Sequence, residues 1–373
     1  MHVPFCQVRC GYCDFNTYTA AELGPRVSRG SFVDTVLLEL RLARDVLGGQ
    51  VPSVSTIFFG GGTPTVLPAE HLGVLVREVA DTFRLGPDAE ITTEANPESV
   101  TPAYLDKLQA AGFTRVSIGM QSAIPHVLEV LDRVHRPGRP EQVVAEARAA
   151  GFEHINLDLI YGAPYETDAD WQASLDAAIG AGPDHISAYP LVVEKGTALA
   201  RQVATGVVPP PDDDVLADRY VQADETLRAA GFEWYEVSNW AATAAARSRH
   251  NQLYWRDAHW WGLGPGAHSH VGGVRWWNVK HPVRYAQLLE AGRSPAAGRE
   301  RLDASARLTE QVMLGVRLRE GLQVEAVPRG GLAKVPQLIS WGLIERSGYR
   351  AGRLVLTQRG RLMADAVVRD LLS

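Results

Sequence analysis

All three cysteines of the chain lie in one short segment near its start, at Cys6, Cys10 and Cys13. An odd number of closely spaced cysteines makes a poor disulfide framework. A structural zinc site would need a fourth ligand, from His2 or Asp14. Iron–sulfur clusters are normally held by four cysteine thiolates, so three would leave one iron of a [4Fe–4S] cluster open to an exchangeable small molecule. We interpret the three cysteines as cluster ligands, with zinc and simple burial as alternatives, and Tyr12 could lie against a flat ligand at the open iron.

A second concentration of chemically capable side chains lies between residues 234 and 281. Seven of the nine tryptophans fall between Trp234 and Trp277, and five of the eleven histidines fall between His250 and His281. Aromatic planes together with histidine suit a large flat tetrapyrrole, because imidazole is a usual axial ligand of haem iron. Trp and Tyr are also common where two parts of a protein pack together. Composition alone therefore leaves open a haem site or an aromatic-rich seam.

Short apolar, β-rich segments alternate with helical patterns up to residue 192, which indicates βα units and a parallel sheet. Counting a stub before Cys6, we predict six strands, fewer than the eight that close a TIM barrel. The sequence therefore predicts an α/β fold with an open three-quarter (β/α)6 barrel. The expected strands after the stub are 56–59, 90–94, 115–118, 154–160 and 185–189, with an edge strand at 232–237. The expected helices are 31–47, 69–84, 102–111, 125–132, 141–150, 168–179 and 215–230.

Polar or glycine-rich patches follow these strands, at the end where such barrels carry their chemistry. The clearest is Gly60-Gly-Gly-Thr63, whose glycines would let backbone approach a ligand closely. A plain strand-to-helix turn is the alternative. Asp158 lies inside the apolar segment 155–160, where a buried carboxylate is costly unless it is paired.

Together these motifs resemble the radical S-adenosylmethionine (SAM) superfamily, through C-x3-C-x2-C with an aromatic residue before the last cysteine. The flanking H-V-P-F-C at residues 2–6 and C-D-F at residues 13–15 resemble its coproporphyrinogen-III-oxidase-like branch. The resemblance covers nearly the whole chain. It implies a [4Fe–4S] cluster whose open iron is chelated by the amino and carboxylate groups of SAM. It also implies that an electron reaching the cluster from a donor can split the sulfonium of SAM to a deoxyadenosyl radical; the sequence does not say whether this happens here.

The same resemblance implies SAM contacts for eight residues, which are Tyr12, Gly61, Gly62, Thr63, Glu94, Gln121, Arg133 and Asp158. Residues 61–63 would meet the methionyl end, and Glu94 would accept the ammonium group. Gln121 and Asp158 would reach ribose hydroxyls, and Arg133 would approach a carboxylate. Taken singly, each could be a structural polar residue of a loop.

Residues 250–255 form an H-N-x-x-Y-W motif, which resembles the haem-chaperone subgroup of this branch and implies His250 as the haem ligand. The other main type is an enzyme, oxygen-independent coproporphyrinogen III dehydrogenase, which decarboxylates two propionates oxidatively. The dehydrogenase pattern has a further Cys where this chain has Phe15, and it lacks H-N-x-x-Y-W. We therefore predict a haem chaperone that binds haem and a SAM-capped cluster and passes haem to acceptor proteins. The dehydrogenase is the alternative, and whether the chain is an enzyme stays open. A further family motif, 262–269, implies tight backbone near the barrel mouth.

We divide the chain into a barrel at 1–240, an aromatic and histidine-rich haem-binding segment packed on it at 241–300, and a C-terminal module at 301–373. The module resembles a winged helix, with helices expected at 304–318, 334–341 and 357–371 and a hairpin of 343–347 with 353–356. Five arginines make it locally basic, namely Arg346, Arg350, Arg353, Arg359 and Arg361. A DNA-binding wing is one interpretation. We favour a docking module with a solvated face, because the chain as a whole is acidic.

The totals limit the class of protein. The chain has 373 residues, 46% of them hydrophobic, and a formal net charge of −6, which allows a large core and argues against a nucleic-acid-coating protein. Closely spaced thiols suggest a reducing compartment. No charged-then-apolar leader precedes Cys6 and no run approaches membrane-spanning length, so we predict a cytoplasmic protein without an integral membrane span. The Tyr that family members carry two residues before the His is absent. We expect that part of the first strand is missing, with a genuinely short N-terminus as the alternative.

Overall fold

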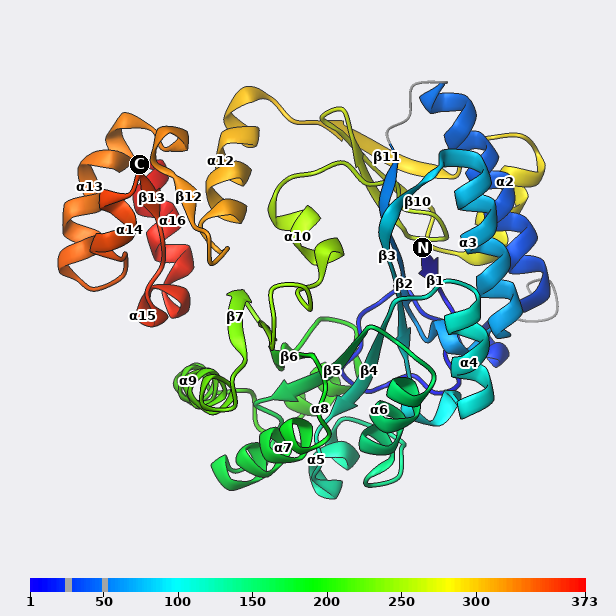
Figure 1. Cartoon of the computed structure of the whole chain (residues 1–373), viewed down its shortest axis with the longest axis horizontal. Coiled ribbons are helices and arrows are strands. Elements are labelled where there is room, and N and C mark those ends of the chain that lie inside the picture. Colours follow the sequence, from blue (N-terminus) through cyan, green and yellow to red (C-terminus); the bar gives the residue numbers. More distant parts are fainter. Residues whose placement is uncertain (24–28, 49–52) are drawn as a thin grey trace.

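The main sheet of the protein has eight strands in the order β1-β2-β3-β4-β5-β6-β8-β7. The computed structural model describes residues 1–23, 29–48 and 53–373 (Figure 1). The first six strands are parallel neighbours, and β1 and β7 stand at the two open ends. Their bounds are β1 His2–Val3, β2 Val54–Gly61, β3 Leu85–Ala95, β4 Arg115–Gln121, β5 His154–Tyr161 and β6 His185–Pro190. The predicted open barrel of six parallel strands is confirmed.

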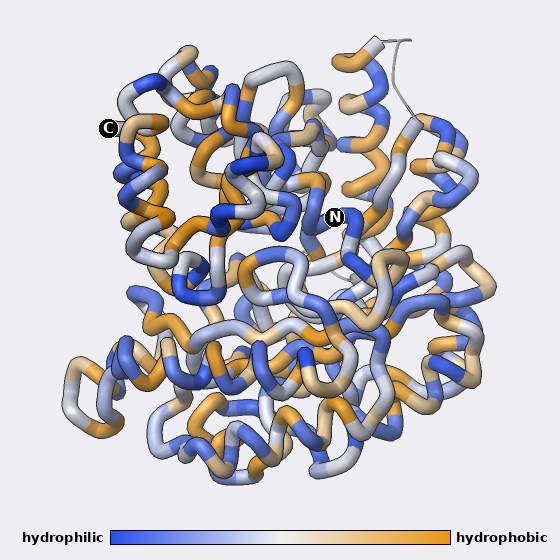
Figure 2. Tube along the Cα trace, turned by 60° about the vertical axis from the view of Figure 1, so that its left-hand side comes forward, coloured by the Kyte–Doolittle hydropathy of each residue, from blue (hydrophilic) through white to orange (hydrophobic). Residues whose placement is uncertain are grey.

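Helices cover the outer face of this sheet (Figure 1). The helices of the barrel are α1 Ala20–Leu23, α2 Arg29–Leu47, α3 Ala69–Phe83, α4 Pro102–Ala110, α5 Pro125–Val130, α6 Arg139–Ala149, α7 Asp168–Gly180, α8 Ala198–Ala204 and α9 Asp213–Ala229, of which α8 packs instead at the strand ends, where Leu199 N donates to the carbonyl of Gly11. Figure 2 shows hydrophobic and hydrophilic residues alternating along them, as helices with one buried face require. Helix α7 begins with a reciprocal cap between Thr167 and Asp170. Leu157, Ile186 and Trp171 are fully buried between sheet and helices.

The sheet ends in an antiparallel hairpin. The predicted strand at 232–237 is present as β7 Glu233–Glu236. A further strand, β8 Asn239–Ala241, lies between β7 and β6 and pairs with both. Strand β8 was not predicted from the sequence, because three residues are too few to show a strand period.

The segment after the barrel folds onto the β1 edge. It contains α10 Arg249–Trp255, β9 His268–Val271, β10 Val274–Asn278, α11 Pro282–Glu290 and β11 Ala296–Arg301, and β9, β10 and β11 form a three-stranded sheet. Gly264 lies so close to the carbonyl of His2 that a Cβ would clash, and its φ is +109°. The tight backbone of the 262–269 motif therefore serves contact with the first strand.

Glu39 joins these parts from inside the core. This carboxyl is 1% exposed and accepts hydrogen bonds from Gly264 N at 2.8 Å, Asn278 Nδ2 at 2.7 Å and the Tyr285 hydroxyl. Burial raises the pKa of Glu39 to about 7, although the three donors oppose the rise. One acid on α2 thus ties the barrel to the segment that follows it.

The C-terminal module has its own hydrophobic core, which includes Val312, Val335, Leu354 and Leu371. Its elements are α12 Ala304–Gly315, β12 Leu322–Gln323, α13 Arg329–Ser340, α14 Arg346–Arg350, β13 Arg353–Leu354, α15 Gln358–Leu362 and α16 Ala364–Leu372.

The predicted hairpin of this module is only partly present. Ile344 and Leu356 form an antiparallel bridge, which is flanked by hydrogen bonds from Glu345 N to the Val355 carbonyl at 2.8 Å and from Thr357 N to the Leu343 carbonyl at 3.0 Å. Residues 346–350, however, form a helix, and β13 pairs with β12 instead. The predicted helix at 357–371 is also interrupted at Met363, whose φ of −107° and ψ of 21° are not helical, so α15 and α16 are separate helices. Gly360 of α15 packs closely against the carbonyl of Leu343.

Several contacts dock the module on the barrel, among them the ion pair of Arg319 with Glu233 at 3.1 Å and the contacts of Arg361. The Arg361 guanidinium donates to both carboxylate oxygens of Asp224, at 3.0 and 2.7 Å, and stacks 4.3 Å from the centre of the Trp234 ring. Arg353 donates to the backbone carbonyls of Glu320 and Gly321 within the module. These arginines serve packing, which supports the docking interpretation. In the described part of the chain, no helix has the length and apolar character needed to cross a bilayer.

Candidate cofactor and ligand sites

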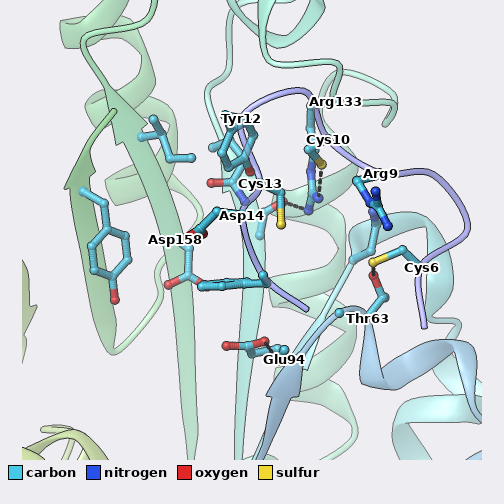
Figure 3. Close-up of a pocket in the computed structure, with 18 of the residues that line it drawn as sticks. Cys6, Arg9, Cys10, Tyr12, Cys13, Asp14, Thr63, Glu94, Arg133 and Asp158 are labelled. Atoms are coloured by element: carbon cyan, nitrogen blue, oxygen red, sulfur yellow. Dashed lines mark hydrogen bonds between the residues drawn. The ribbon is translucent and has the colours of Figure 1, made fainter. Parts of the chain in front are cut away.

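A cavity of about 410 Å³ opens where the parallel strands end (Figure 3). The cysteine loop after β1 forms one wall. Eleven of the twelve predicted site residues line this cavity, and they are Cys6, Cys10, Tyr12, Cys13, Gly61, Gly62, Thr63, Glu94, Gln121, Arg133 and Asp158. His250 is the exception. The structure therefore brings the predicted cluster and SAM residues together and places the predicted haem ligand elsewhere.

The three thiols do not converge on one point. Among the residues that the structure describes, no three His, Cys, Asp or Glu side chains are arranged to hold a single metal ion. A cluster is larger than an ion, so its ligands stand farther apart, and the loop suits a cluster better than zinc. Burial raises the pKa of Cys6, and raises that of Cys13 to about 11. A bound metal would supply the positive charge that favours the thiolates.

Two side chains already donate toward the sulfurs. Thr63 Oγ1 lies 3.8 Å from Cys6 Sγ, and Arg133 Nη1 lies 3.6 Å from Cys10 Sγ. Such hydrogen bonds tune the reduction potential of a cluster held there. Figure 3 shows Thr63 and Arg133 on different sides of the loop, so the sulfurs are approached from both.

Two of the three glycines at the end of β2 make room for the first strand and the start of the cysteine loop, as well as for a ligand. A Cβ on Gly62 would lie 2.5 Å from the carbonyl oxygen of Phe5, and one on Gly61 would clash with the ring of His2. Gly61 also has φ of +108°, which few other residues adopt. The close approach predicted for a ligand is thus made, in part, by the chain itself.

Glu94 is a partly buried acid that forms no salt bridge with the described residues. It accepts a hydrogen bond from Gly61 N at 3.1 Å. Burial, reinforced by Asp158, raises the pKa of Glu94 to about 8. A carboxyl in this position fits an incoming ammonium group, whose charge would restore the ionised form.

Asp158 is held by two neighbours on the sheet. Its carboxylate accepts from Ser117 Oγ at 2.6 Å and from Asn156 Nδ2 at 2.8 Å. Burial raises its pKa, and these donors oppose the rise. Ser117 and Asn156 were not predicted as site residues, although both are polar residues within otherwise apolar strands.

Arg133 and Gln121 complete the cavity. Arg133 donates to the carbonyl of Gly119 at 2.9 Å, and its buried Nε has no partner among the described residues. An unsatisfied guanidinium N–H suits a ligand carboxylate. Gln121 is buried with φ of +65°, a strained value for a residue other than glycine, which is typical of functional positions.

His250 lies on α10, at the opposite end of the barrel interior. Its Nδ1 lies 2.8 Å from Thr56 Oγ1, its Nε2 lies 2.9 Å from the Tyr254 hydroxyl, and its ring stacks on Phe58 at 4.9 Å. Burial lowers the pKa of His250 to about 3, so the imidazole is neutral. A polar cavity of about 240 Å³, which also borders Glu94, separates His250 from the cysteine loop.

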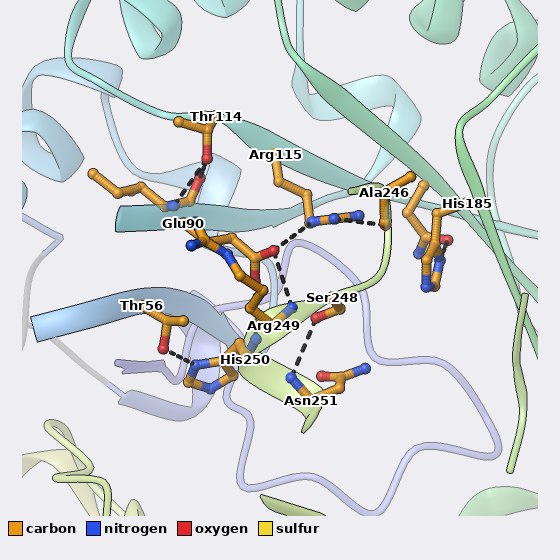
Figure 4. A network of polar contacts seen from close by, with 12 residues as sticks. Thr56, Glu90, Thr114, Arg115, His185, Ala246, Ser248, Arg249, His250 and Asn251 are labelled. Carbon is orange, nitrogen blue, oxygen red and sulfur yellow. Dashed lines mark hydrogen bonds and ion pairs between the residues drawn. The ribbon is translucent and has the colours of Figure 1, made fainter. Parts of the chain in front are cut away.

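A buried ion pair anchors α10 (Figure 4). Glu90 accepts from the backbone amides of Arg249 and His250 at 3.1 and 3.0 Å, and from Arg115 Nε at 3.2 Å. Arg115 also donates to the carbonyl of Ala246 at 2.7 Å. Neither Glu90 nor Arg115 was predicted as a site residue, since nothing in the local sequence marks two charges that meet inside a sheet.

A directed chain of buried hydrogen bonds links the two ends of the barrel. The amide oxygen of Asn156 can only accept, so His185 Nδ1 donates to it at 2.6 Å. Burial lowers the pKa of His185 well below its ordinary value, so neutral Nε2 accepts from the Tyr235 hydroxyl at 2.7 Å. Tyr235 in turn accepts from Ser248 N at 3.1 Å, and Ser248 caps α10. Asn156 also donates to Asp158.

Comparison with known proteins first defines the class. The structure is similar to coproporphyrinogen III oxidase (HemN) from Escherichia coli, a radical SAM enzyme, with a TM-score of 0.85 over 100% of this chain and 89% of that one. Identity is 22%, so this likeness concerns the fold. The family model described as the Radical SAM superfamily matches residues 1–178.

The particular family follows from sequence identity. Over 374 residues the chain is 53% identical to a protein named heme chaperone HemW from Mycobacterium tuberculosis (strain H37Rv), covering 100% of this chain and 94% of that protein. It is 32% identical to heme chaperone HemW of Bacillus subtilis, covering 98% and 97%. The chain belongs to the HemW family of radical SAM proteins. The predicted family is confirmed, and with it the expectation of a [4Fe–4S] cluster and SAM, which the cavity residues fit.

Proposed function

We propose that this chain is a haem chaperone, which binds haem and passes it to acceptor proteins. The observation that carries the proposal is identity of 53% over the full length with a protein named heme chaperone HemW. The dehydrogenase alternative is not favoured, since the likeness to HemN rests on 22% identity and supports the fold alone. Phe15 in place of a further cysteine agrees with this choice.

His250 is the proposed haem ligand. A neutral imidazole offers one nitrogen lone pair to iron, and a ligating histidine commonly donates its other N–H to an oxygen atom. Thr56 Oγ1 is placed to accept that N–H at 2.8 Å. Phe58 and the anchored N-terminus of α10 hold the ring in one orientation.

The cavity at the strand ends is the proposed cofactor site. Cys6, Cys10 and Cys13 would hold the cluster, which supplies one-electron chemistry when an electron donor serves it. The charges of the cavity support the SAM roles, because among the described residues Glu94 forms no salt bridge and Arg133 Nε has no acceptor. The roles expected for residues 61–63, Tyr12, Gln121 and Asp158 belong to the same proposal.

The remaining expectations follow this assignment. We propose a barrel at 1–240, a haem-binding segment at 241–300 and a docking module at 301–373, supported by the separate core of the last. Haem and its acceptor proteins are the proposed partners, with no nucleic acid, since Arg353 and Arg361 are used internally. A cytoplasmic location agrees with three free cysteines.

Haem titration of cluster-reconstituted protein, with and without SAM, tests the proposal. We expect about one haem per chain, bound with the absorption of a histidine ligand. His250→Ala should lose this spectrum, whereas His126→Ala, which alters an exposed histidine on α5, should keep it. Robust vinyl formation from coproporphyrinogen III would instead establish the dehydrogenase, and haem binding unchanged by His250→Ala would remove His250 from its role.

A further inference from the structure

Both ring nitrogens of His250 are already engaged. Thr56 Oγ1 lies 2.8 Å from Nδ1, and the Tyr254 hydroxyl lies 2.9 Å from Nε2. A neutral imidazole has one N–H and one lone pair, so one hydroxyl accepts from the ring and the other donates to it. Iron needs the lone pair. One of the two hydroxyl groups must therefore leave before a haem can bind here.

The two hydroxyls differ in their freedom to move. Thr56 belongs to β2, where it is in register with Glu90 of β3, so its position is set by the sheet. Tyr254 lies on α10 four residues after His250, and it is 40% exposed. Its ring touches His250 and Trp260 edge-on, at 5.0 and 4.8 Å, and part of the side chain is exposed to solvent. Tyr254 is thus the partner that can swing away.

Once Tyr254 has moved away, His250 and Thr56 have the arrangement of a metal-ligating histidine and its hydrogen-bond acceptor. With Thr56 accepting the Nδ1 proton, the lone pair is on Nε2, which faces the Tyr254 hydroxyl. The stack of the ring on Phe58, with planes inclined by 15°, keeps this nitrogen pointing toward Tyr254.

Building on the proposed haem role of His250, we propose that Tyr254 is a latch on its iron-binding nitrogen. In the haem-free chain its O–H donates to Nε2. On haem binding the phenol swings toward solvent, and the Nε2 lone pair passes to iron. On release the Fe–Nε2 bond breaks and the phenol O–H donates to Nε2 again, so no proton or electron is gained or lost.

This hydrogen bond would help a carrier protein to release its haem. A neutral hydrogen bond contributes about 1 kcal/mol, or roughly a fivefold factor in affinity. The phenol therefore weakens haem binding about fivefold without removing the ligand. It also supplies a replacement partner for Nε2 as the haem departs, which lowers the barrier to transfer.

The test is Tyr254→Phe, which removes the hydroxyl and keeps the ring packed on Trp260. We expect haem to bind about fivefold more tightly, with an unchanged absorption spectrum, and to pass more slowly to apomyoglobin used as a scavenger. Thr56→Val should act in the opposite direction and weaken haem binding, because Nδ1–H loses its acceptor. Tyr165→Phe, at an exposed tyrosine bonded to the carbonyl of Val207, should change neither.

The experiments distinguish a wrong haem ligand from a wrong role for Tyr254. If His250→Ala keeps full haem affinity, the proposed ligand is wrong and the latch falls with it. If His250→Ala loses haem but Tyr254→Phe binds haem equally or more weakly, the ligand stands and the latch alone is refuted. A spectrum altered in Tyr254→Phe would likewise refute it, since Tyr254 would then be an iron ligand itself. Equal melting temperatures of the variants and the wild type confirm that each chain folds.

Discussion

Glu94→Gln should move ligand affinity and stability in opposite directions. The amide keeps the shape of the side chain and still accepts from Gly61 N, but it removes the negative charge proposed to meet the ammonium of SAM. A hydrogen bond between charged groups contributes about 1.5–3 kcal/mol, so SAM should bind roughly 10- to 150-fold more weakly.

The same substitution should stabilise the SAM-free protein. The pKa of Glu94 rises from 4.5 to about 8 in the folded chain, chiefly through burial. Because the folded chain holds its proton to higher pH than the unfolded chain, stability is lost as pH rises between these two values. At pH 7, with 1.36 kcal/mol for each pH unit above 4.5, the cost is at most about 3 kcal/mol. Glu94→Gln should recover part of it at pH 7 and almost none near pH 5.

Two measurements check this prediction. Anaerobic calorimetry of SAM on cluster-loaded protein gives the affinity, and wild-type affinity should rise with pH until about 8, where Glu94 is ionised. Thermal unfolding of the SAM-free protein at pH 5 and pH 7 gives the stability. Glu98→Gln, at an acid paired with exposed Arg136 on the neighbouring turn, is the matched control and should leave SAM affinity nearly unchanged. Undiminished SAM affinity in Glu94→Gln would refute the role of Glu94, and lower stability at pH 7 would refute the electrostatic reasoning.

Two further substitutions test the supports of the sites. Arg115→Met leaves Glu90 buried without its cation and loosens α10, so the free energy of unfolding should fall by about 3–5 kcal/mol in urea titrations; an unchanged value would show that the pair does not hold the helix. Asp224→Asn removes the charge facing Arg361, so amides of residues 346–373 should exchange hydrogen faster, whereas exposed Asp218→Asn should have no such effect. Equal exchange in both variants would mean that the module docks by other contacts.

The amino-acid sequence determined the barrel and most of the cofactor cavity by itself. The apolar periods of β2 to β6 are local, and consecutive parallel strands lie side by side, so residues that follow each strand must meet at one edge. This is why the sequence alone predicts that Thr63, Glu94 and Asp158, which are far apart in the chain, lie near the cysteine loop. Strand β8 and the ends of the C-terminal hairpin were not predicted correctly, because segments of two to five residues carry too little pattern.

Only the tertiary structure decided how the buried polar groups are paired. Glu39, Glu90 and His185 lie in ordinary helical or strand patterns, and nothing near them in sequence names their partners. Their pairings depend on which elements pack together, because a buried charge is tolerated only where donors from distant segments reach it. The same holds for His250. Its motif marked it as a ligand, but the hydroxyl of Thr56, 194 residues away, and that of Tyr254 became its partners only when α10 closed against β2.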